Sequence, residues 1–454
     1  NVFSAQNHLI PVKKLIQTFK NIWSIDELKN KILFTLLLVG IYRIGSHIVL
    51  PGIDATSIKT GGSSNGLLGL IDSFSGGAFN NASIFALGIM PYISASIFMQ
   101  LVTVLVPTFQ KMQKEGESGQ KKINQYTRYL TVAVTLVQAS AYVKYLEQMM
   151  MQGNMSMMPG FTNYFLLSTV VVLTAGSLFV MWLGEKITDK GLGNGASIII
   201  MIGIIARLPN TFLQELSAKS TPSGHILLFI LEIALYIAIN MGCILIIQGV
   251  RKVPVNYAKQ IVGNRQFGGA RQFLPLKVNA SGVMPIIFAQ AILFIPTIFA
   301  NFNTEGSGFL RALTDQSNLW YMIIYSVVVI AFTFLYTALI FNPKQIADNL
   351  KQNNGFIPGV KPGQPTVDYI GNIMDKITFP GAVALALIGI LPGIVQRFGV
   401  QPGFASFFGG TSLLIMVAVI LDTLQQIETH LLMRQYDGLM KSGRIQGRQS
   451  GSAV

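Results

Sequence analysis

Long runs of apolar residues alternate with polar segments along this chain of 454 residues. A helix of roughly 20 residues crosses a bilayer core about 30 Å thick, and ten runs reach or nearly reach that length. They cover approximately residues 32–50, 82–106, 129–146, 164–183, 196–208, 226–250, 283–300, 319–341, 377–395 and 407–424. The fifth run is short and suits either a partial span or a buried core helix. Since the runs are too long and continuous for barrel strands, they predict a bundle of membrane-spanning helices.

Positive charge is distributed unevenly between these runs. The chain holds 33 Lys and Arg against 19 Asp and Glu, a net charge of +14. Ten spans place both termini on one side, where 25 cations lie against 6 on the other. The positive-inside rule therefore predicts cytoplasmic termini, and it places the basic segments 251–277 and 342–376 in the cytoplasm as well. The basic residues of these two segments either only set the membrane topology or also form a docking surface for an acidic or nucleic-acid partner.

The count of spans also predicts the domain organisation. Residues 20–217 would hold spans one to five and residues 218–445 spans six to ten, with residues 1–19 unassigned and 446–454 as a tail. An odd number of spans per half inserts the second half with the opposite orientation. That layout is typical of inverted-repeat transport proteins, whose working site lies between the halves near the midplane.

Composition narrows the classes of protein further. Hydrophobic residues make up 51% of the chain and charged residues only 11%, whereas soluble domains carry about 25% charge. A single cysteine, Cys243, excludes an intramolecular disulfide and a cysteine-based zinc site. The four histidines are far apart, and no P-loop, carboxylate pair or nucleophile elbow is found. We therefore expect no enzymatic activity, no metal and no cofactor.

Two further features bear on a transport site. The segment Gly61–Asn81 is rich in glycine and suits a short one-sided helix that is too polar to span; its composition favours an external loop over a re-entrant segment. Ionisable residues inside spans usually mark transporter sites. Here Arg43, Glu232 and Asp422 do not cluster by spacing into an ion pathway.

A series of ordered motifs runs along the chain: Phe74–Ile97 (FSGGAFNNASIFALGIMPYISASI), Lys114–Tyr129, Met181–Ile200, Val255–Gln260, Leu274–Pro285, Tyr336–Gln352, Gly355–Gly363 and Phe407–Val417. Together they resemble the SecY family of protein-conducting channels, over roughly residues 20–445. The resemblance implies an all-α polytopic membrane protein of ten transmembrane helices in two inverted five-helix halves. It also implies that a short re-entrant plug helix lies at about residues 61–77, which replaces the loop interpretation.

The same resemblance implies which residues work. A ring of aliphatic side chains forms the pore constriction, and the six matching residues are all isoleucine: Ile89, Ile93, Ile200, Ile204, Ile287 and Ile415. The implied plug residues are Leu67, Leu68, Leu70, Ile71 and Phe74. The implied residues of the lateral gate are Ser94, Gln100, Asn279, Gln290 and Ile295. A narrow apolar collar opposes ions, which lose their hydration there.

The two basic segments match the family's loops for the ribosome or the SecA motor. The implied docking residues are Arg251, Lys252, Lys259, Arg265, Arg271 and Lys361. Asn264 and Lys361 stand where arginine is often found in the family. Lysine keeps the charge of arginine but loses its bidentate hydrogen-bonding geometry. The docking residues are therefore where this chain differs most from the usual pattern of the family. A gate position that is often aromatic holds Ile295.

The resemblance implies a passive channel in a bacterial plasma membrane, with both termini cytoplasmic. It would pass unfolded secretory polypeptides and release apolar segments sideways into lipid. The implied partners are SecE and SecG subunits, the SecA ATPase, ribosomal RNA and exit-site proteins, and signal sequences. The alternative, an ion-coupled secondary transporter, predicts ionisable residues at the midplane, and a membrane enzyme or an insertase without a pore predicts a catalytic or hydrophilic groove. The sequence offers isoleucines at the midplane and no such groove.

Overall fold

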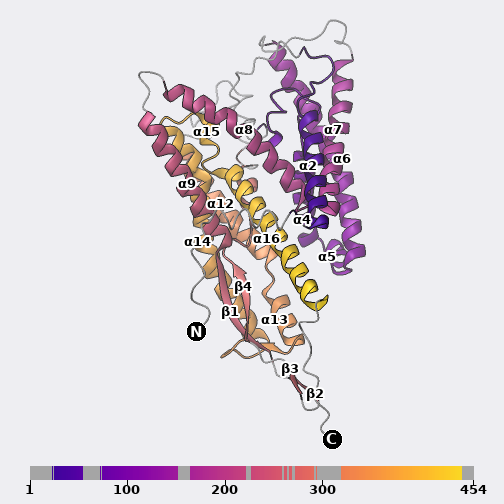
Figure 1. Ribbon diagram of the computed structural model, residues 1–454, viewed down its shortest axis with the longest axis vertical. Coiled ribbons are helices and arrows are strands. Elements are labelled where there is room, and N and C mark those ends of the chain that lie inside the picture. Colours follow the sequence, from indigo (N-terminus) through magenta and orange to yellow (C-terminus); the bar gives the residue numbers. More distant parts are fainter. Residues whose placement is uncertain are drawn as a thin grey trace.

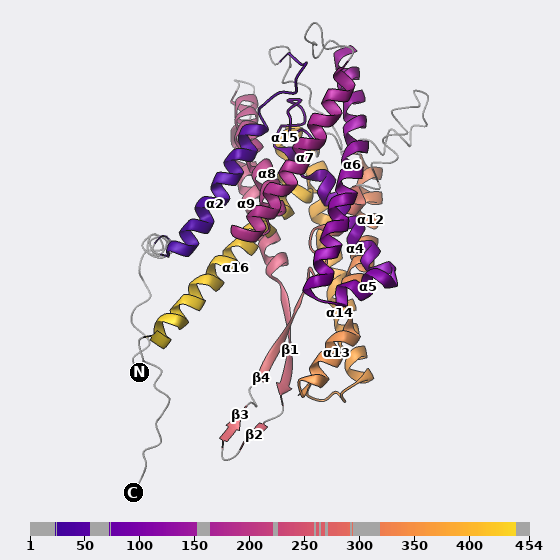
Figure 2. The same ribbon diagram turned by 90° about the vertical axis from the view of Figure 1, so that its right-hand side faces the viewer.

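The computed structural model describes residues 23, 25–54, 72, 74–151, 164–220, 226–257, 260–262, 265–267, 271–290, 293 and 318–441. The helices of its first part are α2 (Asp26–Gly45), α4 (Met90–Leu105), α5 (Pro107–Lys114), α6 (Glu117–Met151), α7 (Phe165–Lys190) and α8 (Gly195–Lys219). Those of its second part are α9 (Ile226–Gln248), α12 (Leu319–Ile340), α13 (Pro343–Gln352), α14 (Gln364–Arg397), α15 (Pro402–Ala405) and α16 (Gly410–Lys441). Figures 1 and 2 show α15 at one end of the helix bundle and the strands with α13 at the other.

Nine of the ten predicted runs coincide with helices in the part of the chain that the structure describes. The seventh run, 283–300, is described only at residues 283–290 and 293, and residues 284–290 are helical. The short fifth run opens a complete helix, α8, because its polar second half continues the helix to Lys219. Asn194 caps this helix by accepting a hydrogen bond from the Ser197 backbone N–H at 3.3 Å.

By length and hydropathy, six helices among the described residues are able to cross a bilayer. They are α7, α8, α9, α12 together with α13, α14 and α16. A seventh candidate joins α4 and α5 across a bend of 101°. Helix α2 is excluded by its charges, including Lys29, Lys31 and Arg43, and α6 is weakened by Gln138 and Lys144. The count of ten spans therefore stays a prediction.

The two basic segments form one small unit with strands that the sequence analysis does not predict. Strand β1 (Val250–Tyr257) pairs antiparallel with β4 (Arg271–Lys277) and, through Asn256, with β5 (Gly355–Phe356). A short hairpin of β2 (Gln260–Val262) and β3 (Arg265–Phe267) lies beyond them. The unit has its own apolar core, which includes Val253, Val255, Leu276, Leu350, Ile357, Ile370 and Met374. The described residues of the segments 251–277 and 342–376 therefore belong to one folded body.

Helix α8 lies where the two parts of the chain meet. It contacts α2 and α7 from the first part and α9, α15 and α16 from the second. Each part also has a core of its own, one built on α6 and α7 and one on α9, α12, α14 and α16. Side chains at the meeting line must therefore come from segments that are far apart in the sequence.

Candidate pore, closing segment and gate

One buried cluster gathers most of the isoleucines expected at the pore. It contains Ile89, just before α4, then Ile200 and Ile204 of α8 and Ile415 of α16, with exposed fractions between 0% and 7%. Ile93 of α4 packs against the same cluster and is half-buried. We call these five isoleucines the collar. Ile287 is half-buried and lies outside the cluster, although Val283 of its segment packs against it.

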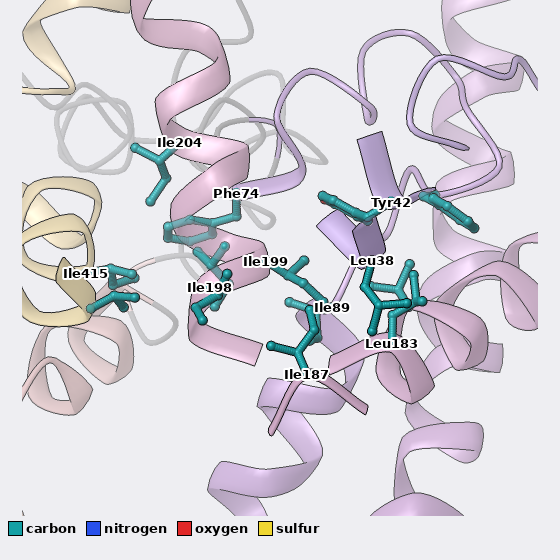
Figure 3. Close-up of a cluster of buried hydrophobic side chains, with 14 of the residues drawn as sticks. Leu38, Tyr42, Phe74, Ile89, Leu183, Ile187, Ile198, Ile199, Ile204 and Ile415 are labelled. Atoms are coloured by element: carbon teal, nitrogen blue, oxygen red, sulfur yellow. The ribbon is translucent and has the colours of Figure 1, made fainter. Parts of the chain in front are cut away.

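Local geometry explains why the collar residues meet. Ile200 and Ile204 are four residues apart on α8, so they lie on one face of the helix. That face meets α16, which carries Ile415, and the start of α4 (Figure 3). All five side chains are branched and aliphatic, without a hydrogen-bonding group. An ion placed among these side chains would lose water without gaining a polar partner.

Phe74 fills the collar from the loop between α2 and α4. It is 7% exposed and belongs to the same cluster; Figure 3 shows its ring near Ile198 and Ile204. We call the described residues 72 and 74–77 the closing segment. The other expected plug residues lie outside the described part of the chain: Leu67, Leu68, Leu70 and Ile71.

Backbone contacts hold the closing segment in place. Arg43 Nη1 of α2 donates to the Gly76 carbonyl oxygen at 2.9 Å, and the Tyr42 hydroxyl donates to the Ser75 carbonyl at 3.4 Å. Gly203 of α8 touches the segment so closely that a Cβ there would lie 2.3 Å from the Phe74 carbonyl oxygen. Gly76 itself adopts a φ of 68°, which favours glycine. The segment is therefore fitted to two helices.

Asp72 and Arg207 form an ion pair that the sequence analysis missed. Arg207 Nη2 of α8 lies 2.7 Å from Asp72 Oδ2, and the Asp72 side chain is fully buried. Asn80 also donates its backbone N–H and side-chain amide to this carboxylate, at 3.0 and 2.8 Å. Burial raises the pKa of Asp72 above its ordinary value, and Arg207 partly offsets this. An acidic residue inside an otherwise apolar segment was the available signal.

Three of the expected gate residues form hydrogen bonds with side chains outside the expected set. Tyr336 of α12 donates its hydroxyl to Gln100 Oε1 of α4 at 2.8 Å, and Tyr336 was not predicted from the sequence. Thr411 of α16 donates to Gln290 Oε1 at 3.4 Å, and Ser281 donates to Asn279 Oδ1 at 3.4 Å. Ser94 is exposed and donates to its own helix. The remaining gate residue, Ile295, lies outside the described residues.

The basic surface is described in part. Arg251, Lys252 and Lys361 are exposed on the strand unit. Lys259 and the side chains of Arg265 and Arg271 lie outside what the structure describes. Figure 2 shows that α5 lies at the end of the helix bundle beyond which β1, β4 and α13 extend.

Two of the three in-span ionisable residues, Glu232 and Arg43, make contacts within the protein, and the third, Asp422, is exposed. Glu232 of α9 pairs with Lys219, which also lies 3.1 Å from Glu215 at the end of α8. Arg43 binds the closing segment. Among the described residues, no group of three or more His, Cys, Asp or Glu is placed to hold a metal.

Solved structures share this fold at low sequence identity. One described as a protein-conducting channel has a TM-score of 0.57 and 17% identity, and the match covers 88% of this chain and 92% of that one. Another is described as Sec61 in a canine ribosome–channel complex, with a TM-score of 0.55, 16% identity, and coverage of 88% and 92%. A third, with a TM-score of 0.55, 17% identity and the same coverage, is described by a plug domain that stabilises the closed state.

Closer relatives come from bacteria. The protein translocase subunit SecY of Corynebacterium glutamicum is 40% identical over 446 residues, which cover 94% of this chain and 99% of that protein. The subunit of the same name from Chlamydia muridarum is 40% identical over 455 residues, covering 95% and 100%. The sequence profile of the SecY family matches residues 83–424, which is most of the chain. The chain therefore belongs to the SecY family.

Proposed function

We propose that this chain is a passive channel that passes unfolded secretory polypeptides across a membrane. The observation that carries the proposal is the collar of five isoleucines on α4, α8 and α16, filled by Phe74 of the closing segment. Such a collar resists ions when closed. Branched aliphatic side chains move aside around an extended chain and bind none of it specifically. The relatives named protein translocase subunits support this function, and family membership does not support an ion-coupled transporter.

The proposal extends to the membrane and the partners. The bacterial relatives and the positive-inside rule support a bacterial plasma membrane with both termini in the cytoplasm. The strand unit then lies in the cytoplasm, where Arg251, Lys252 and Lys361 form a basic surface for ribosomal RNA or an acidic face of the SecA motor. SecE and SecG are proposed as the accessory subunits, by family resemblance.

We propose a lateral gate at the contact between α4 and α12. The hydrogen bond from Tyr336 to Gln100 joins the first and second parts of the chain. Phe288 stacks on Phe332 of α12 with ring centroids 5.7 Å apart, so the segment around residue 288 packs against α12. An arriving apolar signal sequence replaces this polar contact with apolar burial and shifts the equilibrium towards the open gate.

The gate proposal predicts an effect of Tyr336→Phe. The variant keeps the ring but loses a hydrogen bond whose net worth is about 0.5–1.5 kcal/mol, so opening becomes about 2- to 10-fold easier. We expect export of a reporter whose signal sequence has been made less apolar to rise accordingly. Tyr369→Phe, at an exposed tyrosine of α14, is the matched control. Unchanged signal dependence in both Tyr336→Phe and Gln100→Leu would contradict the proposal.

A stalled secretory nascent chain tests the channel itself. Photo-crosslinkers placed singly at Ile89, Ile204, Ile287 and Ile415 should each capture the chain. A crosslinker at Leu235, on the exposed surface of α9, should not. Absence of crosslinks at all four isoleucines would remove the pore assignment.

The same preparation tests docking. The charge-reversed variant Arg251→Glu with Lys361→Glu should weaken engagement of the ribosome or motor, and so lower all four crosslinks together. A binding assay with the isolated partner separates this from a pore defect. Partner binding equal to that of the unaltered chain would refute the docking surface and leave the pore proposal intact.

A further inference from the structure

The closing segment carries one charged residue among its described positions, and that charge is buried. Asp72 is 0% exposed, whereas Arg207, its partner on α8, is 30% exposed. A buried carboxylate without a counter-charge costs several kcal/mol, while a guanidinium in contact with water is hydrated without its partner. The two halves of this ion pair are therefore unequal. Loss of the ion pair therefore costs more free energy at the buried Asp72 than at the partly exposed Arg207.

The position of Arg207 relative to the collar gives this inequality a consequence. Ile200, Ile204 and Arg207 follow at spacings of four and three, so they lie on one face of α8. Arg207 is thus about one turn beyond the collar, on the wall against which the closing segment is seated. The segment leaves its place only if Asp72 gives up its counter-charge and becomes hydrated.

We propose that Asp72 and Arg207 form a charge latch for the closed channel, in which Arg207 permits the seated segment by neutralising Asp72. The proposal rests on the proposed channel function and adds to it the residue that governs closure. Whether the closing segment is seated then depends on the pairing of Asp72 with Arg207 as well as on the apolar contact of Phe74.

The latch predicts an unusual order of variants. Arg207→Met leaves the Asp72 carboxylate buried and unpaired, so we expect the segment to unseat at least about tenfold more often. Asp72→Asn keeps the shape of the side chain, and its single amide oxygen keeps one of the two hydrogen bonds from Asn80. Arg207 is 30% exposed and stays hydrated, so we expect this variant to seat the segment much better than Arg207→Met does. The double variant removes both charges and should return towards normal seating. A contact that acted only by packing would not be rescued in this way.

Lowering the pH should restore seating in Arg207→Met, because protonation removes the charge of Asp72 as the substitution Asp72→Asn does. Among the described residues, the charged and titratable groups that act on Asp72 are Arg207 of α8 and, from α6, Tyr142 and Tyr145. Arg43 of α2 binds Gly76 of the same segment. Burial raises the pKa of Asp72 in the seated state. The seated state then binds a proton more tightly than the hydrated one, so lowering the pH favours seating. The defect of Arg207→Met should shrink as the pH falls from about 7 to about 5.

Thiol labelling measures seating without requiring translocation. Cys243 is replaced by alanine and a single cysteine is placed at Ala78, which is 1% exposed next to the segment. The chain is reconstituted in vesicles and exposed to a membrane-impermeant maleimide, and passive ion flux is followed in parallel. The labelling rate should rise at least about tenfold in Arg207→Met. In the double variant with Asp72→Asn it should return towards the rate of the unaltered chain. Lys144→Met, which removes an exposed cation of α6, should change nothing.

Each outcome decides the latch or the pore separately. Equal labelling of Arg207→Met and the unaltered chain overturns the latch, and so does a double variant that labels as fast as Arg207→Met. If nascent-chain crosslinks form at the isoleucines in either case, the pore proposal stands without the latch. Faster labelling with unchanged ion flux supports the latch and counts against the pore.

Discussion

The variant Lys219→Met should lose about 3–5 kcal/mol of unfolding free energy, because it leaves two buried carboxylates without a counter-charge. Lys219 lies between Glu215 of α8, whose side chain is 0% exposed, and Glu232 of α9, whose side chain is 11% exposed. Glu215 also accepts the backbone N–H of Gln401 at 2.9 Å. The cluster therefore joins the last helix of the first part to the second part. Denaturant unfolding of the purified protein in detergent measures the loss.

Two controls make this prediction sharp. Replacing Glu215 and Glu232 by glutamine in the Lys219→Met background removes all three charges and should recover most of the stability. Lys144→Met removes an exposed lysine and should change the unfolding free energy by no more than about 0.5 kcal/mol. A Lys219→Met protein as stable as the unaltered chain would show that the ammonium is not needed to bury the carboxylates.

Gly203→Val should prevent the closing segment from seating. A Cβ at residue 203 would lie 2.3 Å from the Phe74 carbonyl oxygen and 3.2 Å from the Gly76 nitrogen. Overpacking of this kind costs about 1–3 kcal/mol. Because the clash exists only when the segment is seated, it shifts the equilibrium towards the unseated state by about 5- to 150-fold. Passive ion flux through vesicles that contain the variant should rise by a comparable factor.

Gly242→Val provides the matched control for this variant. Gly242 lies within α9, and a Cβ there meets nothing within 4 Å, so the same substitution adds a side chain without a clash. Its ion flux should equal that of the unaltered chain. A Gly203→Val protein that folds normally and remains as tight as this control would contradict the proposed role of the closing segment.

Most of the helices could be predicted because hydropathy is a local property. The runs at 226–250 and 319–341 each appear as one helix of nearly the expected length, and the run at 164–183 appears as one helix that continues to Lys190. The fifth helix was underestimated, since its apolar run ends at Leu208 while the helix continues through Pro209 to Lys219. The strand pairing of β1 with β4 was not predicted, because bases and turn formers mask the alternation of buried Val253 and Val255.

The candidate site divides in the same way. The collar isoleucines could be named from family motifs, and the structure brings five of them together. The latch, the Lys219 cluster and the bond from Tyr336 to Gln100 could not be named. The last of these joins residues 236 positions apart in the sequence. No local pattern encodes such a pairing.

The amino-acid sequence by itself determined a bundle of apolar helices, their family and an uneven distribution of charge, because each of these is written in short stretches of residues. Only the tertiary structure decided which charges are paired. By the sequence alone, Arg207 is one more cation near the end of the fifth apolar run, and Glu232 is an ionisable residue inside a predicted span. The fold buries Asp72 beside the first and places Lys219 beside the second. Since a buried charge requires a partner in space, its role depends on the packing of helices that are distant in sequence.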